Sequence, residues 1–366
     1  MRSSSLLLLL FTLFSSFCWA NDGSYLMAGN HLIPISDKSI QVKKEILSIK
    51  RNDRGIIEVS VHYEFYNNGP RKNIIVGFEA FPTYNTSLHY SEDGSHPYMR
   101  GFSVLMNKKE LPYKISHVSD TLYKARERAT INAHNFSKIK KEFESGEEGY
   151  FEYTFVYHFD ATFEQGLNII QHNYEYEPGG TANHHYDFDY ILDAAGRWGN
   201  GVIEDFTLII DVGPFQQYTI DKTFSKSASD WITVGKGEVT DYYPPFPEDS
   251  DFYLGVRIER GVIVYQKKNF KPSQNLFVHC FYPIDPYDLT YLPYNHDVTT
   301  TYFTPDTEIH RKIMYNLPFA RRGYVFKNAD IQRFYDTMPW YKKDPNYVPN
   351  VDELFVTEKE WLKQYK

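Results

Sequence analysis

The sequence predicts a mainly β protein with some helix: an antiparallel β-sandwich-like region with one inserted amphipathic helix, then a small helical C-terminal module. Between residues 40 and 284, short runs of alternating apolar and polar residues are separated by turn residues, as in antiparallel sheets. Tyr and Phe, which favour strands, number 31 and 27 in 366 residues. Beyond about residue 299 the apolar spacing changes to three and four, which is typical of helices.

The first twenty residues predict a secretory signal peptide. Arg2 supplies the positive charge, Leu6–Phe14 is an apolar run, and Cys18–Ala20 offers small residues for cleavage before Asn21. No later segment reaches the ~18 apolar residues of a membrane span. We therefore expect an exported protein, periplasmic or extracellular, with no transmembrane segment in the mature chain.

The β-rich domain is expected over residues 21–298, as one sandwich or as two sandwich subdomains. Ile40–Lys50 and Ile56–Tyr66 are strand-like and flank the polar turn Asn52–Gly55. The further expected strands are Ile74–Phe81, Phe102–Met106, Leu111–Val118 (paired as a hairpin with the preceding one), Gly149–Phe159, Gly166–Tyr176, Val202–Val212, Asp230–Val234, Tyr253–Glu259, Gly261–Lys267 and Leu276–Tyr282.

One long helix interrupts this pattern at about residues 119–145. Its apolar residues recur at steps of three and four, from Leu122 to Phe143, and the residues between them are mostly polar or charged. That spacing is typical of an amphipathic helix.

The helical module is expected over residues 299–366. Thr304–Asp306 resembles a helix start with Pro at the first helical position. Asn328 is the expected cap of a second helix, and Thr357–Glu360 reads as the capping box of a third.

This tail resembles the YARHG domain, a presumed extracytoplasmic module of bacterial proteins. The resemblance lies in the run Asn316–Phe326, where the motif reads FARRG at Phe319–Gly323, followed by Trp340 and Tyr341. Two of the five motif positions differ, and the replacement of His by Arg removes a titrating imidazole. The family implies an exported protein but no established activity.

The preceding region loosely resembles a domain of unknown function found in secreted bacterial proteins. The residues that carry this second resemblance are Tyr190–Leu192, Trp198–Gly199, Val202–Ile203, Phe206, and Pro34 with Lys44–Leu47. Together the two resemblances imply a protein of the bacterial envelope.

The module also carries the candidate binding residues Arg321, Arg322, Gly323, Trp340 and Tyr341. Two arginines can hold a carboxylate or phosphate bidentately while an aromatic face stacks on a ring. In the structural alternative, the arginines pack on Trp340 or bond helix-end carbonyls, and Gly323 supplies a special backbone angle.

A second candidate site is the metal-ligand cluster His184, His185, Asp187 and Asp189. In a regular strand His185, Asp187 and Asp189 share one face and His184 points to the other. Zinc would need three or four such ligands, and calcium could use the two aspartates. The alternative is a polar loop or edge strand without metal.

Enzymatic signatures are otherwise missing, because the sequence has no G-x-S-x-G elbow, P-loop or G-x-G-x-x-G motif. We expect no cofactor, and we read Cys280, in a strand-like run, as a buried apolar residue rather than a nucleophile. Carboxylates that could pair as in glycosidases are Glu152, Glu175, Glu177 and Asp205.

The hypothesis that follows is a noncatalytic binding or assembly protein of the bacterial envelope, whose tail module recognises a cell-wall polymer or envelope protein. The net charge of −8 argues against a nucleic-acid partner. One alternative is a metal-dependent or carboxylate hydrolase of wall polymers. The other is a structural subunit whose tail docks on its own β domain.

Overall fold

The computed structural model describes residues 31–34, 39–80, 94–96, 98–119, 153–190, 192, 198–199, 201–242, 251–271, 274–282, 289–295, 297 and 304–366. The expected signal peptide at 1–20 lies outside these residues. The expected helix at 119–145 also lies outside them, except for Ser119, which ends a strand.

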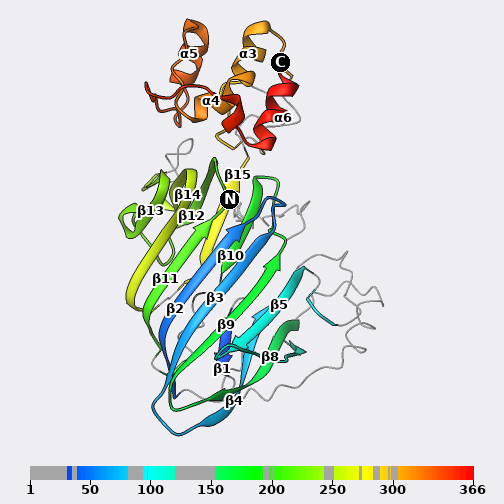
Figure 1. Ribbon diagram of the computed structural model, residues 1–366, viewed down its shortest axis with the longest axis vertical. Helices are drawn as coiled ribbons and strands as arrows, with labels where there is room; N and C mark the ends of the chain where they lie inside the picture. Colours follow the sequence, from blue (N-terminus) through cyan, green and yellow to red (C-terminus); the bar gives the residue numbers. More distant parts are fainter. Residues whose placement is uncertain are drawn as a thin grey trace, which may run out of the picture.

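Two sheets form the β region, and Figure 1 shows them below a group of helices. The described strands are β1 (His31–Pro34), β2 (Ile40–Arg51), β3 (Ile57–Asn67), β4 (Lys72–Ala80), β5 (Met99–Met106), β6 (Lys109–Glu110), β7 (Lys114–Ser119), β8 (Tyr153–Phe163), β9 (Gly166–Tyr176), β10 (His184–Tyr190), β11 (Ile203–Asp211), β12 (Gln216–Asp221), β13 (Trp231–Thr240), β14 (Tyr253–Phe270) and β15 (Leu276–Phe281).

The larger sheet has eleven strands in the order β10-β15-β12-β14-β11-β2-β3-β9-β5-β6, with β13 paired to β14. The smaller sheet has the order β1-β4-β8-β7. The mainly β prediction with a helical C-terminal module is confirmed. Among the described strands the pairing is antiparallel as expected, except that β11 runs parallel to β2.

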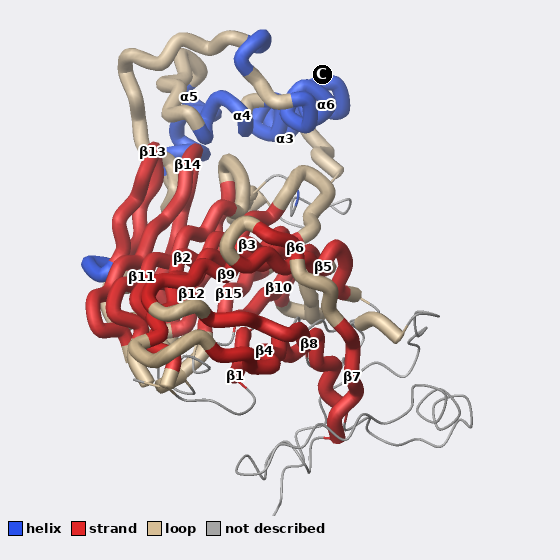
Figure 2. The backbone as a smooth tube through the Cα atoms, turned by 60° about the horizontal axis from the view of Figure 1, so that its bottom comes forward, coloured by secondary structure: helices blue, strands red, loops and turns tan. Residues whose placement is uncertain are grey.

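A single hydrophobic core joins the two sheets, which Figure 2 shows as two layers. The ring of Phe65 on β3 lies 5.7 Å from that of Phe163 on β8, and Phe78 on β4 lies 4.9 Å from Tyr174 on β9. The core is therefore rich in aromatic rings, which accounts for part of the high Tyr and Phe content.

Alternation holds along β3, where Val59, Val61 and Phe65 are buried as expected. In β2 it changes phase, because a register shift between Val42 and Lys44 inserts one extra residue. Such a bulge turns the following side chains to the opposite face. Glu45 consequently enters the core together with Leu47.

Three strand expectations need correction. Residues 111–118 do not form a hairpin with β5, because Asn107 and Lys108 both have positive φ and make a tight turn to the short β6. The chain then crosses to the small sheet as β7.

The two strands expected at 253–267 are one continuous strand, β14. Gly261, with φ +101°, faces Gly235 of β13 there, and a Cβ on Gly261 would lie 2.0 Å from Val234 O. The close approach therefore requires glycine, and Gly261 marks this contact rather than the start of a separate strand. Strand β12 was not expected at all.

The helical module contains α3 (Glu308–Tyr315), α4 (Leu317–Arg321), α5 (Ala329–Asp336), the short 3-10 turn η5 (Val351–Glu353) and α6 (Val356–Gln364). A further 3-10 turn, η2 (Ala228–Asp230), precedes β13. Asn328 caps α5 as predicted. The expected starts of the other two helices are wrong by a few residues. Thr307 rather than Thr304 caps α3, and α6 begins before Thr357, with Phe355 at the cap position.

None of the helices in the described part of the chain combines the length and apolar character that a membrane crossing requires.

Candidate functional site

The side chains of the two arginines of the FARRG motif point inward and contact other residues of the protein. Arg321, the last residue of α4, has a side chain 0% exposed, 3.8 Å from Glu358, and its guanidinium lies 5.8 Å from the centre of the Phe215 ring. Burial lowers the pKa of Arg321 to about 10. The guanidinium therefore remains charged at neutral pH.

Arg322 makes a bidentate pair with Glu358 of α6, with both N–H···O distances at 2.8 Å. It also donates to Pro318 O at 2.7 Å and stacks 4.5 Å from the centre of the Phe215 ring. Glu358 in turn accepts from the backbone N–H of Phe355. Paired guanidinium and carboxylate groups of this kind fix geometry as well as charge, so Arg322 joins α4 to α6.

Gly323 has φ +84°, the left-handed conformation that the structural alternative expected. A Cβ at this position would lie 2.5 Å from Lys342 O and 2.8 Å from Asp344 N. The Gly323 carbonyl accepts from Asp344 N at 2.8 Å. The motif glycine thus allows the segment after α5 to close onto the end of α4.

Trp340 and Tyr341 do not open onto solvent together. Trp340 is buried and donates from Nε1 to Leu292 O at 2.7 Å. The Tyr341 hydroxyl donates to Tyr324 O at 2.6 Å. Both aromatic residues therefore have structural contacts, and neither alone offers an exposed stacking platform.

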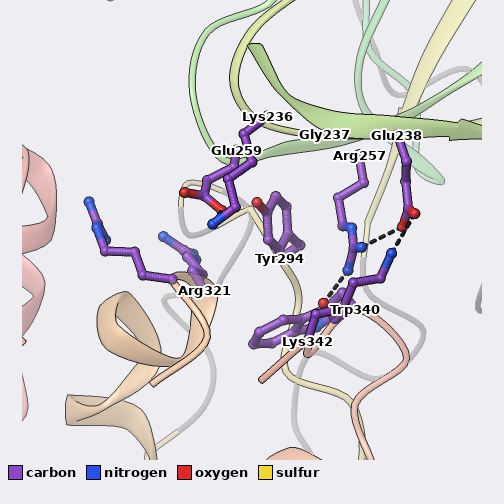
Figure 3. Close-up of a pocket in the computed structure, with 10 residues that line it drawn as sticks. Lys236, Gly237, Glu238, Arg257, Glu259, Tyr294, Arg321, Trp340 and Lys342 are labelled. Carbon is purple, nitrogen blue, oxygen red and sulfur yellow. Dashed lines mark hydrogen bonds and ion pairs between the residues drawn. The ribbon is translucent and has the colours of Figure 1, made fainter. Parts of the chain in front are cut away.

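The structure nevertheless gathers three of the five predicted residues around one hollow, which we call the junction pocket. It has a volume of about 140 Å³ and lies where β13 and β14 meet the helical module (Figure 3). Its lining consists of Lys236, Gly237, Glu238, Arg257, Glu259, Tyr294, Arg321, Arg322, Trp340 and Lys342. Gly323 and Tyr341 do not line it.

Charged side chains from the sheet and the module meet in this pocket. Glu238 on β13 pairs with Arg257 on β14 and with Lys342 of the module, the latter at 2.5 Å. Burial alone would raise the pKa of Glu238, but the hydrogen bond from Lys342 and the charges of Arg257 and Lys342 lower it overall. Lys236 lies 2.7 Å from Glu259.

A smaller hollow of about 100 Å³ adjoins the junction pocket and shares Glu238, Arg257, Trp340 and Lys342 with it. Sequence reasoning missed the strand residues of both hollows. The available signal was the charged pairs two residues apart, Lys236 with Glu238 and Arg257 with Glu259, since residues at this spacing share one face of a strand.

The predicted metal cluster is only partly assembled. His184 Nδ1 lies 2.8 Å from Asp187 Oδ1. The expectation that His184 faces away from Asp187 is wrong, because a register shift between His184 and Tyr186 inserts an extra residue in β10. His185 is that extra residue, and it lies 3.8 Å from Asp297 instead.

Two residues that the sequence did not single out complete the cluster. His279 on β15 places Nδ1 2.8 Å from Asp187 Oδ1, and its Nε2 lies 3.2 Å from Asp221 Oδ1 on β12. Burial alone would lower the pKa of His279, but the hydrogen bonds and charges of the two aspartates raise it to about 9. The sequence signal that could have found His279 is the alternation of its strand, which places this histidine on the outward face. Asp221 lies on β12, a strand that was not predicted, so no sequence signal pointed to it.

Asp189 does not join this cluster. It is buried, and burial raises its pKa to about 7. Cys280 is fully buried, and burial raises the pKa of its thiol, as expected for an apolar residue.

The described carboxylates among the predicted glycosidase residues each pair with a different basic side chain. The described pairs are Glu175 with Arg54 at 3.7 Å, Glu177 with Arg100, and Asp205 with Lys268 at 2.9 Å. Glu152 lies outside the described residues.

Comparison with known proteins confirms the resemblance of the tail: residues 289–366 match the YARHG domain. No curated protein matches the chain. The looser resemblance of the preceding region stays a prediction.

Several solved structures align with this chain at low identity. A protein of Legionella pneumophila subsp. pneumophila str. Philadelphia 1, described as a candidate nutrient binding protein, is 14% identical with a TM-score of 0.48, over 94% of this chain and 100% of that chain. An M1 zinc metallopeptidase from Deinococcus radiodurans is 8% identical with a TM-score of 0.28, over 68% of this chain and 43% of its own. The chain thus spans less than half of that enzyme.

Proposed function

We propose that this chain is an exported, noncatalytic binding protein of the bacterial cell envelope, and that its junction pocket holds a carboxylate or phosphate group of a cell-wall polymer. The observation that carries the proposal is the surplus of cationic side chains around this pocket. The match of residues 289–366 to the YARHG domain supports the envelope location. We also propose the division into a β domain at 21–298 and a module at 299–366.

The charge balance of the pocket favours an anionic guest. Five cationic side chains line it, from Lys236, Arg257, Arg321, Arg322 and Lys342. The lining carboxylates Glu238 and Glu259, with Glu358 behind the arginines, make three, so two positive charges remain in excess. Charge-assisted hydrogen bonds to carboxylate or phosphate are the strong ones, and here they would form in a partly enclosed site.

The junction pocket does not stand alone. The adjoining hollow, bounded by Trp340 and Pro339, shares four lining residues with it and could take a neighbouring part of the polymer. The two hollows together therefore suit an anionic group that is carried by a longer chain.

A second candidate function is a structural subunit whose tail docks on its own β region. Arg257 of β14 donates to the backbone oxygen of Trp340, and Phe215, before β12, belongs to the hydrophobic cluster of the module. These contacts attach the tail to the sheet whether or not the pocket binds a ligand. The experiment must therefore change the pocket charge without breaking the docking.

The double variant Lys236→Gln/Lys342→Gln lowers the pocket charge by two and keeps the docking contacts of Arg257 and Phe215. It removes one exposed ion pair between the module and the sheet, that of Lys342 with Glu238. Both side chains are at the surface, 49% and 64% exposed, and each pairs with one carboxylate. Lys343→Gln/Lys363→Gln is the matched control, because these lysines are 48% and 71% exposed and also pair with one carboxylate each, away from the pocket. Cosedimentation with purified sacculi measures binding.

We expect the pocket variant to bind sacculi at least about tenfold more weakly and the control to bind normally. Two treated preparations distinguish the two anions. Loss of binding to sacculi with amidated carboxylates would indicate a carboxylate, and loss of binding to sacculi stripped of phosphodiester-linked polymers would indicate a phosphate. Equal binding by both variants, or no binding by the unaltered protein, would leave the structural candidate.

A further inference from the structure

We infer that His184, Asp187 and His279 form a three-ligand site for a divalent transition-metal ion of the zinc type, and that Asp221 positions His279 within it. This site lies on strands β10, β15 and β12, none of which contributes to the junction pocket. The inference is therefore independent of the function proposed above.

Strand register explains why these residues meet. Asp187 of β10 is paired with His279 of β15, which is paired in turn with Thr219 of β12. Asp221 lies two residues beyond Thr219 and so shares its face. The bulge at His185 turns His184 onto the same face. Rigid neighbouring strands thus hold all four side chains.

The three ligand atoms are close enough to share one ion. The Nδ1 atoms of His184 and His279 are each 2.8 Å from Asp187 Oδ1, and all three atoms lie within 4.8 Å of one another. Ligands about 2.0–2.2 Å from zinc in a tetrahedral site are about 3.3 Å apart. Lengthening the two Asp187 contacts by about half an ångström, with the two histidine nitrogens drawn toward each other, would admit the ion.

The contact of His184 lacks the geometry of a hydrogen bond. Its Nδ1 atom is buried and has no hydrogen-bond partner among the described residues, although it lies 2.8 Å from Asp187 Oδ1. A buried polar atom in a native structure is normally hydrogen-bonded. An ion between the ring nitrogen and the carboxylate would give this nitrogen a partner, whereas Asp187 Oδ1 already has one in His279.

Asp221 lies on the opposite side of the His279 ring, 3.2 Å from Nε2. Metal-binding histidines almost always donate their other ring N–H to a carboxylate, carbonyl or water, which fixes the tautomer and the ring orientation. In this structure His279 Nδ1 and Asp187 Oδ1 form a hydrogen bond. An ion that displaces the Nδ1 proton, while the proton on Nε2 faces the Asp221 carboxylate at 3.2 Å, would bind the lone pair of Nδ1. Asp221 is thus a positioning residue rather than a ligand.

The chemistry of the three ligands determines which class of ion the site would bind, and the site is open to solvent. Two imidazoles and one carboxylate suit zinc and similar transition metals, whereas calcium and magnesium prefer oxygen ligands throughout. The side chains of His184, Asp187 and His279 are 19%, 21% and 19% exposed, so an ion can enter from solvent. Three protein ligands also leave a fourth position open for water or an external donor.

The test uses the purified, untagged protein after chelator treatment. Calorimetric titration with zinc chloride is expected to show one high-affinity site, with one zinc per chain by elemental analysis. Cobalt bound at the same site is expected to give the intense visible absorption of a tetrahedral ion. Calcium and magnesium are expected to give no comparable binding.

Substitution of single residues tests which side chains bind the ion. His184→Gln and Asp187→Asn are each expected to weaken zinc binding more than about 100-fold, and Asp221→Asn about 10–100-fold. His185→Gln is the matched control, since this adjacent histidine faces Asp297, and zinc affinity should not change. Thermal melting of each variant without metal checks that the fold is retained, and the three variants on two strands guard against failure of any one.

The inference is overturned if the unaltered protein binds no zinc at micromolar concentrations. It is equally overturned if correctly folded His184→Gln and Asp187→Asn variants keep the same zinc affinity and stoichiometry as the unaltered protein.

Discussion

At the scale of single residues, the buried titratable groups of the β core determine how the stability of the fold depends on pH. Glu45 is buried on β2, and the Tyr63 hydroxyl lies 3.3 Å from its carboxyl oxygen. Burial is the dominant effect and raises the pKa of Glu45 to about 8, despite the hydrogen bond from Tyr63, which lowers it. Glu45 is therefore mostly protonated in the folded protein at pH 7 and mostly ionised in the unfolded chain.

This difference predicts a pH-dependent stability. The folded state keeps the Glu45 proton between pH 4.5 and 8 and the unfolded state loses it, so Glu45 lowers the free energy of unfolding as pH rises through this window, by up to about 1.4 kcal/mol per unit. Glu45→Gln removes the titrating group. We expect the variant to gain stability relative to the unaltered protein between pH 5 and pH 8, measured by urea unfolding.

The comparison with Glu45→Gln isolates this effect, because other buried groups act differently. Burial lowers the pKa of His172 to about 3, so its imidazole stays neutral in the folded protein while it takes up a proton in the unfolded chain below about pH 6.5. The contribution of His172 to the free energy of unfolding is therefore full above pH 6.5 and is lost as pH falls toward 3. Glu110→Gln, on the exposed strand β6, is the control. A stability difference that is the same at pH 5 and pH 8 would contradict the account of Glu45.

At the scale of secondary-structure elements, the sequence predicted most strands but not where their faces change. Alternation in Ile40–Lys50 correctly predicts β2, yet a one-residue bulge moves Glu45 into the core. The bulge at His185 likewise brings His184 to Asp187. Bulges depend on pairing with a neighbouring strand, which alternation along one strand does not contain. His279 and Asp221 were missed for the same reason, since register alone brings them to Asp187.

The tail motif was more predictable, because its glycine signals a local backbone requirement. Gly323→Ala should destabilise the module, since alanine would be strained at φ +84° and its Cβ would meet Lys342 O at 2.5 Å. We expect a loss of more than about 2 kcal/mol, measured by chemical unfolding.

Gly166→Ala provides the control for the backbone angle alone. Gly166 has φ +92°, but beyond its chain neighbours no described atom lies within 4 Å of the place that a Cβ would take. It should lose only the roughly 1–2 kcal/mol of left-handed strain. Equal losses for the two variants would show that the contact of Gly323 with the segment after α5 contributes nothing.

At the scale of the whole molecule, the central feature is the junction between the sheet and the helical module. The module stands at the end of β13 and β14, remote from the small sheet (Figure 1). The protein has a net charge of −8, yet the junction pocket collects five cationic side chains. The net negative charge opposes the approach of an anionic polymer, so we expect attraction to come from this local group of cations and to weaken as salt is added.

The sequence pointed to this site through Arg321, Arg322 and Trp340 but could not reveal the sheet half of it. Lys236 and Arg257 lie far upstream in the chain and reach the pocket only because β13 and β14 extend to the module. The arginines also serve the module's own packing, as the bidentate pair of Arg322 with Glu358 shows. A residue that holds the fold can therefore also contribute charge to a binding site.

Hydrogen–deuterium exchange of the full protein, with and without soluble wall fragments released from sacculi, tests the central claim most directly. Our account predicts slower exchange both at Lys236–Glu238 on β13 and at Trp340–Lys342 of the module, because both line the junction pocket. Strand β7 of the small sheet should not change. Binding of the fragments with protection elsewhere, and none at these two segments, would contradict the assignment of the junction pocket as the binding site.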